Sequence, residues 1–228
     1  MTTARHHDDS TPQRLLSAAA EVFAAKGYRA GTIAEICRRA GANIAAVNYY
    51  FRNKQTLYVQ AWRRSFERSL EAHPPDAGIP ADAPVEQRLR GRILALMQRV
   101  ADPATHEFEI VQKEVASPTG LLAEVMRESI QPIRQAFGEL MREMLGADAP
   151  EEQVLLCQRS IHAQCFHPLM RQRHRRAFGR GGQDDGLRGL DVSVEAMADH
   201  VFRFSLAGIR DIRRQIQRDR PRDVEQHA

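Results

Sequence analysis

The chain has 228 residues, of which 43% are hydrophobic and 27% charged, a balance that supports a folded core. No run of 18 apolar residues occurs, and residues 1–14 lack the apolar stretch of a signal peptide, so neither a membrane span nor a secretory leader is predicted. Three cysteines without a scaffold spacing fit a reducing compartment, and we expect a cytoplasmic protein.

The first predicted helix covers residues 11–27. Ser10 or Thr11 can cap its start, Pro12 suits its first turn, and Gly27 is a typical C-terminal stop. One apolar stripe follows helical spacing, formed by Leu15, Leu16, Ala19, Val22 and Phe23.

Residues 32–54 predict two short helices joined by a tight turn. Thr32 is a good N-cap for the first of them, and Glu35 completes a capping-box pattern three residues later. Gly41 tolerates the left-handed conformation that ends a helix, and Asn43 can cap the second helix. This arrangement is typical of a helix-turn-helix.

The second short helix, about residues 44–51, spans only two turns and cannot be stable alone in water. Val47 and Phe51 lie four residues apart, so we expect them to face a core. The residues left outward are Ile44, Ala45, Asn48 and Tyr49.

A fourth helix is predicted from Asn53 to about Ala72, which makes the first 72 residues a compact bundle of four helices. Residues 1–72 hold 11 Lys and Arg against 6 Asp and Glu, which leaves 22 against 23 for residues 73–228. The positive excess of the chain therefore lies on the helix-turn-helix part. Binding to DNA phosphates needs such an excess, because it releases counterions.

Several motifs together resemble the DNA-binding domain of TetR-family transcriptional repressors. They are AAAEVFAAKGY, TIAEI, AGAN, NYYF and the pattern NK-x-x-LY, and they cover residues 13–62. The segment ANIAAVNYYFRNK is also similar to the branch with CecR-type regulators, and so is CQRSIHAQCFHP in the second half.

The resemblance assigns DNA contacts to particular positions of this chain. It implies that Thr32, Tyr49, Tyr50 and Lys54 contact phosphates. It also implies that the turn and the outward helix face contact base edges, through Asn43, Ile44, Ala45 and Asn48. The residue types agree, because Asn can pair with adenine, and small apolar groups can contact a thymine methyl. Many members of the family carry other residues at 44, 45 and 48, so the operator sequence cannot be transferred from them.

Other interpretations of these residues remain open. One of the two tyrosines can be a packing residue, Asn48 can be merely solvent-exposed, and Arg29, Arg38, Arg39 and Arg52 can form a solvated basic face.

A proline-rich linker is predicted over residues 73–84, followed by a helical part over residues 85–228. Its expected helices cover residues 85–101, 105–116, about 119–145, 151–172 and 193–217. Pro132 is expected to kink or divide the third of these near Ser129. Residues 174–191 are rich in Gly and charge and predict a loop.

The predicted fold class is therefore all-α, with an N-terminal three-helix helix-turn-helix domain and a larger helical domain for ligand binding and dimerisation. The resemblance implies a homodimer built on the last two helices. The expected interface residues are Leu155, Phe166, Met197, Val201, Ser205, Gly208, Ile209 and Ile212. Alternatively, this stripe belongs to the core of a single chain.

The resemblance also implies a small-molecule effector that releases the protein from an inverted-repeat operator. The expected lining mixes apolar and polar side chains, as ligand pockets do, namely Phe108, Val111, Gln112, Met126, Ile130, Phe137, Gln158 and His162. Each of these residues can instead be ordinary core.

Three other functions are compatible with parts of the sequence or are excluded by it. A metal- or redox-responsive site could use Cys157, His162 and Cys165, but their spacing does not match a tetrahedral metal finger. A sequence-indifferent DNA-binding protein would share the basic charge. No nucleophile elbow, phosphate-binding loop, dinucleotide fingerprint or HExxH motif is present, so we expect neither an enzyme nor a cofactor.

Overall fold

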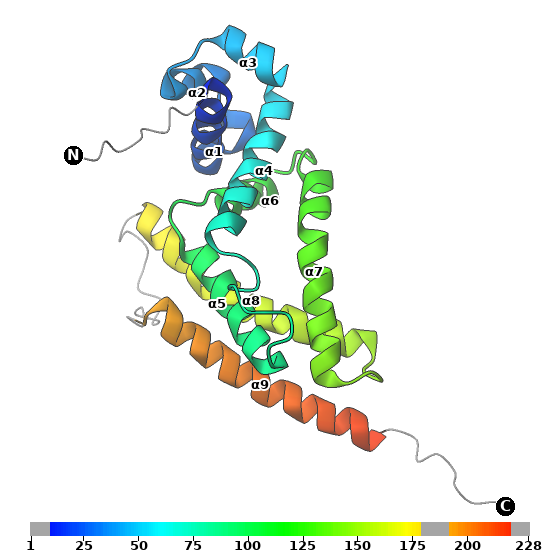
Figure 1. Cartoon of the computed structure of the whole chain (residues 1–228). Helices are drawn as coiled ribbons and strands as arrows, with labels where there is room; N and C mark the ends of the chain where they lie inside the picture. The colour runs from blue at the N-terminus through cyan, green and yellow to red at the C-terminus, as the bar shows by residue number, and fades with distance from the viewer. Residues whose placement is uncertain (1–9, 179–191, 220–228) are drawn as a thin grey trace, which may run out of the picture. The chain divides into compact units, whose positions relative to one another are not determined.

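The computed structural model describes residues 10–178 and 192–219, without the side chains of residues 174–178. Within these ranges it is helical and contains no strand, which confirms the predicted fold class (Figure 1). The helices are α1 (Thr11–Ala30), α2 (Ile33–Ala40), α3 (Ile44–Phe51), α4 (Lys54–Ala72), α5 (Val85–Ala101), α6 (Glu107–Ala116), α7 (Ala123–Leu145), α8 (Glu151–Phe178) and α9 (Val194–Asp219).

The described chain divides into two compact units. The first combines residues 10–72 with residues 103–130, and the second combines residues 73–102 with 131–178 and 192–219. The sequence predicts a single domain over residues 85–228. Residues 103–130 group with the N-terminal helices instead, because α6 packs against α1 and α4.

The core of the first unit lies where α1 meets α2, α3, α4 and α6. Phe23 of α1 and Tyr58 of α4 are fully buried, and their rings meet edge to face with centroids 4.9 Å apart. Such pairs add to the free energy gained from apolar burial. The unit therefore has a continuous core beneath α2 and α3.

Gly27 interrupts α1 with φ 75° and ψ 176°, a conformation that glycine adopts without a Cβ clash. The sequence placed the end of the helix here, whereas helical structure resumes and continues to Ala30. The interruption sets the course of the last turn, where the ring of Tyr28 lies 5.1 Å from that of Tyr58.

Glu114, near the end of α6, joins three parts of the first unit. Its carboxylate accepts hydrogen bonds from the Tyr58 hydroxyl at 3.0 Å, from the Thr119 amide and hydroxyl at 2.8 Å, and from the Gly120 amide at 2.9 Å. Burial alone would raise the pKa of Glu114. The bonds from Thr119, Tyr58 and Gly120 outweigh that effect and hold the pKa below its usual value.

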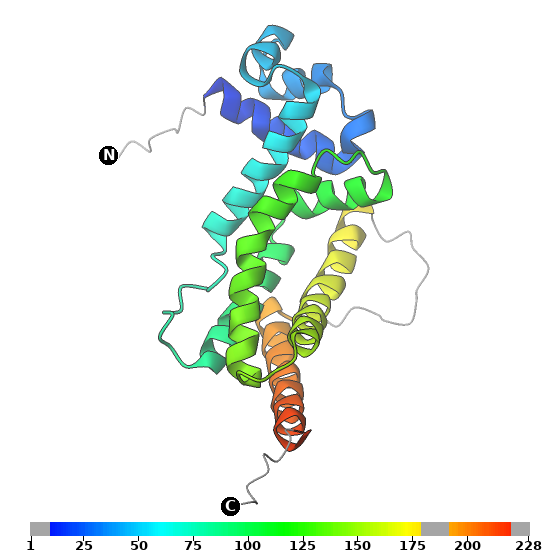
Figure 2. The same ribbon diagram turned by 90° about the vertical axis from the view of Figure 1, so that its right-hand side faces the viewer.

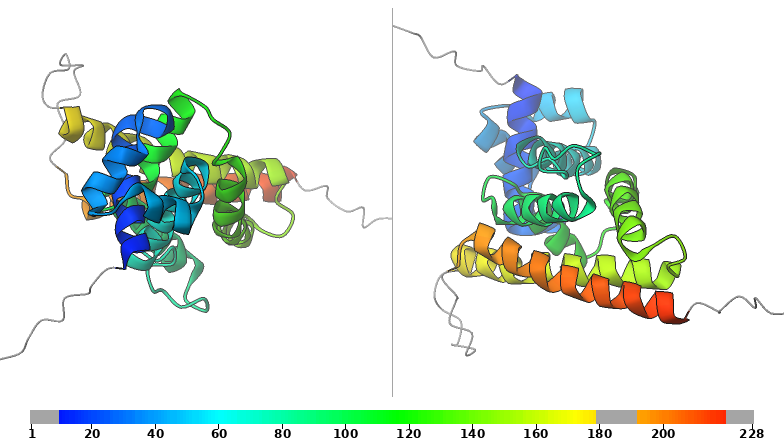
Figure 3. Two further views of the ribbon diagram at one scale, coloured as in Figure 1. Left: turned by 90° about the horizontal axis from the view of Figure 1, so that it is seen from above. Right: turned by 60° about the horizontal axis from the view of Figure 1, so that its bottom comes forward.

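In the second unit, α5 packs against both α8 and α9, which also contact each other (Figure 3, right). The predicted loop over residues 174–191 begins later than expected, because α8 continues to Phe178. Residues 179–191 lie outside the described part of the chain.

Pro132 does not divide α7, which runs as one helix from Ala123 to Leu145 (Figure 2). Proline removes one backbone donor, which leaves the carbonyl four residues earlier without its partner. Pro132 is exposed, so water can reach that carbonyl. The boundary between the two units falls beside this residue, between Ile130 and Gln131.

The linker is folded onto α5 rather than extended. A Cβ on Gly91 would come within 2.4 Å of Ile79 Cδ1 and 3.0 Å of the Asp76 carbonyl oxygen, so only glycine leaves room for the linker. Arg88 Nε also donates to the Ala83 carbonyl at 3.0 Å. Residues 73–84 therefore have defined contacts within the second unit.

The lowered pKa of Glu114 predicts an acid-dependent loss of stability. Its stabilising effect is complete above the unfolded-chain pKa of about 4.5 and disappears as the pH falls through the lower folded-state value. The Glu114→Gln substitution should cost about 1–3 kcal/mol at neutral pH. It should also flatten the decline in unfolding free energy below about pH 5.

Urea denaturation of both proteins at a series of pH values checks this prediction. Glu67→Gln, at a half-exposed carboxylate of α4, serves as the matched control and should leave the decline unchanged. If the unfolding free energies of the wild type and the Glu114→Gln protein fall equally at acid pH, Glu114 does not cause the acid-dependent loss of stability.

Candidate nucleic-acid interface

The turn between α2 and α3 is held by caps on both helices. Thr32 Oγ1 accepts from the Glu35 amide at 3.2 Å, and Asn43 Oδ1 accepts from the Ala46 amide at 2.8 Å. Gly41 ends α2 in the left-handed conformation, with φ 60° and ψ 39°. These are the N-caps and the C-terminal glycine that the sequence predicts.

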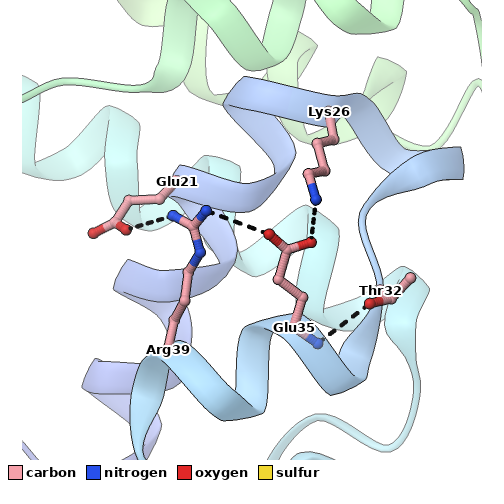
Figure 4. Close-up of polar contacts among 5 residues, drawn as sticks. All are labelled: Glu21, Lys26, Thr32, Glu35 and Arg39. Atoms are coloured by element: carbon pink, nitrogen blue, oxygen red, sulfur yellow. Dashed lines mark hydrogen bonds and ion pairs between the residues drawn. The ribbon is translucent and has the colours of Figure 1, made fainter.

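Glu35 serves a different purpose from the one its capping-box position predicts. Its side chain pairs with Lys26 of α1 at 2.6 Å and with Arg39 at 3.3 Å, and Arg39 also reaches Glu21 at 3.2 Å (Figure 4). The hydrogen bond from Lys26 is the main cause of the lowered pKa of Glu35. These ion pairs connect α2 to α1. They also neutralise Lys26 and Arg39, so these two cations are less available to bind an anionic partner.

The short helix α3 presents one face to the core and the opposite face to solvent, as predicted. Val47 and Phe51 are 1% and 3% exposed, whereas Ile44 is 54% and Tyr49 81% exposed. Ala45 and Asn48 lie on the exposed side with them. Helix α3 therefore offers a row of small, apolar and amide side chains on a fixed scaffold.

The two tyrosines at the end of α3 are both exposed, Tyr50 to 44%. Their rings meet edge to face with centroids 4.9 Å apart, and Tyr50 also lies 6.3 Å from the ring of Phe51. Neither ring is enclosed in the core of the single chain. Both hydroxyls are thus available for the phosphate contacts that the resemblance assigns to them.

The side chains of Asn43 and Asn48 differ in the hydrogen bonds that they can still form. The side-chain oxygen of Asn43 already accepts the capping bond, so a bidentate contact with adenine would compete with that cap. Asn48 is exposed, and the described structure gives its side-chain amide no hydrogen-bond partner. Of the two side-chain amides, only that of Asn48 has both its donor and its acceptor unoccupied, which the predicted contact with adenine needs.

Lys54 is held in place by the last turn of α1. Its Nζ donates to the Arg29 carbonyl at 3.4 Å and lies 4.6 Å from the centre of the Tyr28 ring. Partial burial lowers the pKa of the Lys54 ammonium. An ammonium has three donors, so one bond to Arg29 leaves two for a phosphate. The sequence does not predict the contact between Tyr28 and Lys54, and its only signal for it is an aromatic residue directly after Gly27.

The basic side chains near α2 and α3 fall into two groups. Arg39 is paired with two carboxylates, and Arg29 donates weakly to the Pro118 carbonyl at 3.5 Å. Arg38 and Arg52 are exposed and form no hydrogen bond or ion pair within the described residues. The two unpaired guanidinium groups are the ones that remain available to an anionic partner.

The residues predicted to line an effector site are spread over both units. Phe108, Val111 and Gln112 lie on α6, and Met126 and Ile130 lie on the first part of α7, all in the first unit. Phe137, Gln158 and His162 belong to the second unit. All are partly buried except His162, which is exposed.

Within the second unit, the predicted residues have both apolar and polar neighbours. The Phe137 ring lies 6.0 Å from the Arg92 guanidinium carbon, and Gln158 Nε2 donates to the Arg134 carbonyl at 3.1 Å. His162 is exposed on one side, but α8 and its neighbours crowd the imidazole enough to desolvate it partly, which lowers its pKa, and the positive charges of Arg134 and Arg99 lower it further. The cations here favour a negatively charged group.

The predicted dimer residues range from buried to exposed in the single chain. Val201, Ser205 and Ile209 are no more than 7% exposed in the single chain, where α9 packs on α5. Phe166, Met197 and Ile212 are partly buried, whereas Leu155 and Gly208 are exposed. The stripe of α9 therefore contributes at least partly to the core of its own chain.

The cysteines do not gather into a metal site. Cys157 and Cys165 are buried, and burial raises the pKa of both thiols, that of Cys165 to about 12. Over residues 10–173 and 192–219, no group of three His, Cys, Asp or Glu side chains is placed to hold a metal ion. Nothing in the structure favours the metal-responsive alternative. No helix of the described residues is long and apolar enough to cross a membrane.

Two family descriptions match this chain. Residues 15–61 match the one described as bacterial regulatory proteins, tetR family. Residues 85–209, more than half of the chain, match the C-terminal domain of the HTH-type transcriptional dual regulator CecR.

Individual relatives agree with this match. The HTH-type transcriptional regulator SrpR of Pseudomonas putida is 29% identical over 59% of this chain and 61% of its own length. CecR of Shigella flexneri is 27% identical over 65% of this chain and 70% of its own. The chain thus spans about three fifths of the first relative and somewhat more of the second.

Solved structures show the same fold. FadR of Bacillus subtilis, determined in complex with stearoyl-CoA, has a TM-score of 0.63 at 16% identity and covers 86% of this chain and 97% of its own. The helix-turn-helix, its exposed face and these matches define a DNA-binding transcriptional regulator. The chain belongs to the TetR family, in its CecR-like branch.

Proposed function

We propose that this protein binds an inverted-repeat operator as a homodimer and is released from it by a small amphipathic effector. The observation that carries the DNA-binding part is the solvent-facing row on α3, which the caps and the buried Val47 and Phe51 hold rigidly. A fixed, exposed helix of this kind is what a major groove admits.

The contacts on this row divide into two kinds. Tyr49, Tyr50 and Lys54 suit phosphate contacts, which set affinity and position without reading sequence. Asn48 with Ile44 and Ala45 suits base edges, where an amide reads adenine and an apolar group meets a thymine methyl. A sequence-indifferent DNA-binding protein would use only the phosphate contacts. A substitution at Asn48 therefore tests whether binding is sequence-specific.

The Asn48→Ala substitution should therefore reduce the preference for operator over random DNA. We expect operator affinity to fall by about 1–3 kcal/mol per half-site, while affinity for a random duplex and its salt dependence stay nearly unchanged. Fluorescence anisotropy at matched salt measures both, with an operator selected from a random-sequence library by the wild-type protein.

Lys54→Gln is the matched comparison for this test. It should weaken binding to both duplexes alike, because a phosphate contact carries no sequence information. Equal affinity of the wild-type protein for operator and random DNA would contradict sequence-specific binding altogether.

The proposed dimer uses the faces of α8 and α9 that their own chain leaves uncovered. Leu155 and Leu156 are 41% and 48% exposed, and Phe204 is 64% exposed. A Cβ on Gly208 would meet nothing within 4 Å, so a partner helix could approach closely there. Two recognition helices must lie about 34–36 Å apart to reach successive major grooves, which is why a second copy is required.

The Phe204→Arg or Leu155→Arg substitution should convert the proposed dimer to a monomer without reducing the helix content. Both side chains are exposed in the single chain, so the charge disturbs only the proposed interface, where an unpaired buried cation costs several kcal/mol. Sedimentation equilibrium and circular dichroism test this. Val115→Arg, at a 74% exposed residue of α6, should stay dimeric. A dimer that survives both substitutions would place the interface elsewhere.

The proposed effector carries an apolar chain and an anionic group. Phe137 offers an aromatic surface, and Gln158 lies beside the main chain of Arg134, in a region with several guanidinium groups. The fold relative FadR was solved with an acyl-CoA, a ligand of this chemistry. An effector lowers DNA affinity only as far as it prefers the conformation that does not bind DNA.

Stearoyl-CoA should raise the thermal stability of the protein and lower its operator affinity by about 5- to 150-fold, the usual range of coupling between two sites. Free coenzyme A, which lacks the apolar chain, is the control ligand and should do neither. Phe137→Ala should weaken the response to stearoyl-CoA without changing DNA affinity in its absence. Failure of stearoyl-CoA and other amphipathic anions to change either quantity would contradict this effector class.

A further inference from the structure

Arg52 occupies a backbone conformation that side chains rarely adopt. Its φ is 66° and its ψ −49°, and the Asn53 amide donates to the Phe51 carbonyl at 2.7 Å. A hydrogen bond across three residues with a positive central φ defines a γ-turn of the rare, strained kind. This turn forms the whole connection between α3 and α4.

The turn is fixed from both sides. Phe51 is anchored in the core at 3% exposure, and Asn53 caps α4 by accepting from the Thr56 amide at 2.9 Å. The Arg52 amide also donates to the Asn48 carbonyl at 3.1 Å. The surrounding contacts thus impose the conformation, and a local rearrangement cannot relieve it without losing one of them.

Glycine would adopt this conformation without the clash that a Cβ causes. In the described residues, positive φ values occur at five glycines and only two other residues, Arg52 and Ala77. Carrying a side chain at position 52 therefore reduces stability. Strain of this kind persists where surrounding contacts impose it, and such positions cluster at binding and active sites.

No hydrogen bond or ion pair of the Arg52 side chain offsets the strain within the described part of the chain. The side chain is exposed, and within residues 10–173 and 192–219 it forms neither a hydrogen bond nor an ion pair. It stands two residues after Tyr50 and two before Lys54, between the proposed phosphate-binding side chains. A guanidinium is always charged, and its planar fork matches the oxygens of a phosphate.

We propose that Arg52 is a further phosphate-binding residue of the DNA interface, retained at the cost of fold stability. This inference rests on the proposed DNA-binding function. It assigns Arg52 to affinity and not to sequence discrimination, because a phosphate contact is the same at every base pair.

The Arg52→Gly substitution should change stability and DNA binding in opposite directions. We expect the melting temperature to rise by about 2–4 °C as the strain is removed. Affinity for operator and random duplexes should fall together, by roughly tenfold at 0.1 M salt. The slope of log affinity against log salt should become shallower by about 1.8, for one phosphate contact in each of two subunits.

Three controls separate the charge from the strain. Arg52→Gln keeps the strained backbone, so its affinity and salt slope should match those of Arg52→Gly while its melting temperature stays near that of the wild type. Ala77→Gly removes strain in the linker and should raise the melting temperature with no effect on DNA. Arg68→Gln, at an exposed arginine of α4, shows what the loss of any surface cation does to binding.

The outcomes distinguish this inference from the function on which it rests. Wild-type protein that binds no duplex would contradict the DNA-binding proposal itself. Wild-type binding with an unchanged salt slope in Arg52→Gly and Arg52→Gln would overturn only the role of Arg52. A lower melting temperature for Arg52→Gly would overturn the claim that the side chain is kept against a stability cost.

Discussion

An eight-residue helix cannot keep its shape in water, so everything that α3 does depends on the two side chains that anchor it. Val47 and Phe51 are buried in the first unit, and the Asn43 cap fixes the other end. The long helices α1 and α4 supply the core that receives them. The first unit is therefore organised around presenting one short helix in a fixed orientation.

The local parts of this arrangement could be predicted from sequence because short-range chemistry determines them. Caps at Thr32 and Asn43 and the left-handed Gly41 act within a few residues, and a helical period of 3.6 assigns Val47 and Phe51 to one face. Contacts between distant residues were missed. The capping-box pattern at Glu35 does not predict that its carboxylate pairs with Lys26 and Arg39. No neighbouring residue indicates that the Tyr28 ring contacts Lys54.

The second unit shows the limit of periodicity more clearly. The helical spacing of Val201, Ser205 and Ile209 predicts that one face of α9 is buried. It does not predict whether α5 of the same chain or a second copy of the protein covers that face. The assignment of α6 to the first unit has the same cause, since no spacing reveals which core a helix joins. The mixed apolar and polar character that predicts the effector-site residues is shared by ordinary core residues.

The different bonding of Asn43 and Asn48 bears on how the proposed DNA contacts of this regulator could change. The side chains of Ile44, Ala45 and Asn48 are exposed and form no cap or ion pair in the described structure, whereas Asn43 caps the start of the helix. Substitutions at exposed positions usually change stability little, so we expect a duplicated copy of the protein to be able to change these three residues while it stays folded. At Asn43, by contrast, the oxygen that caps the helix is the same atom that the proposed base contact would use.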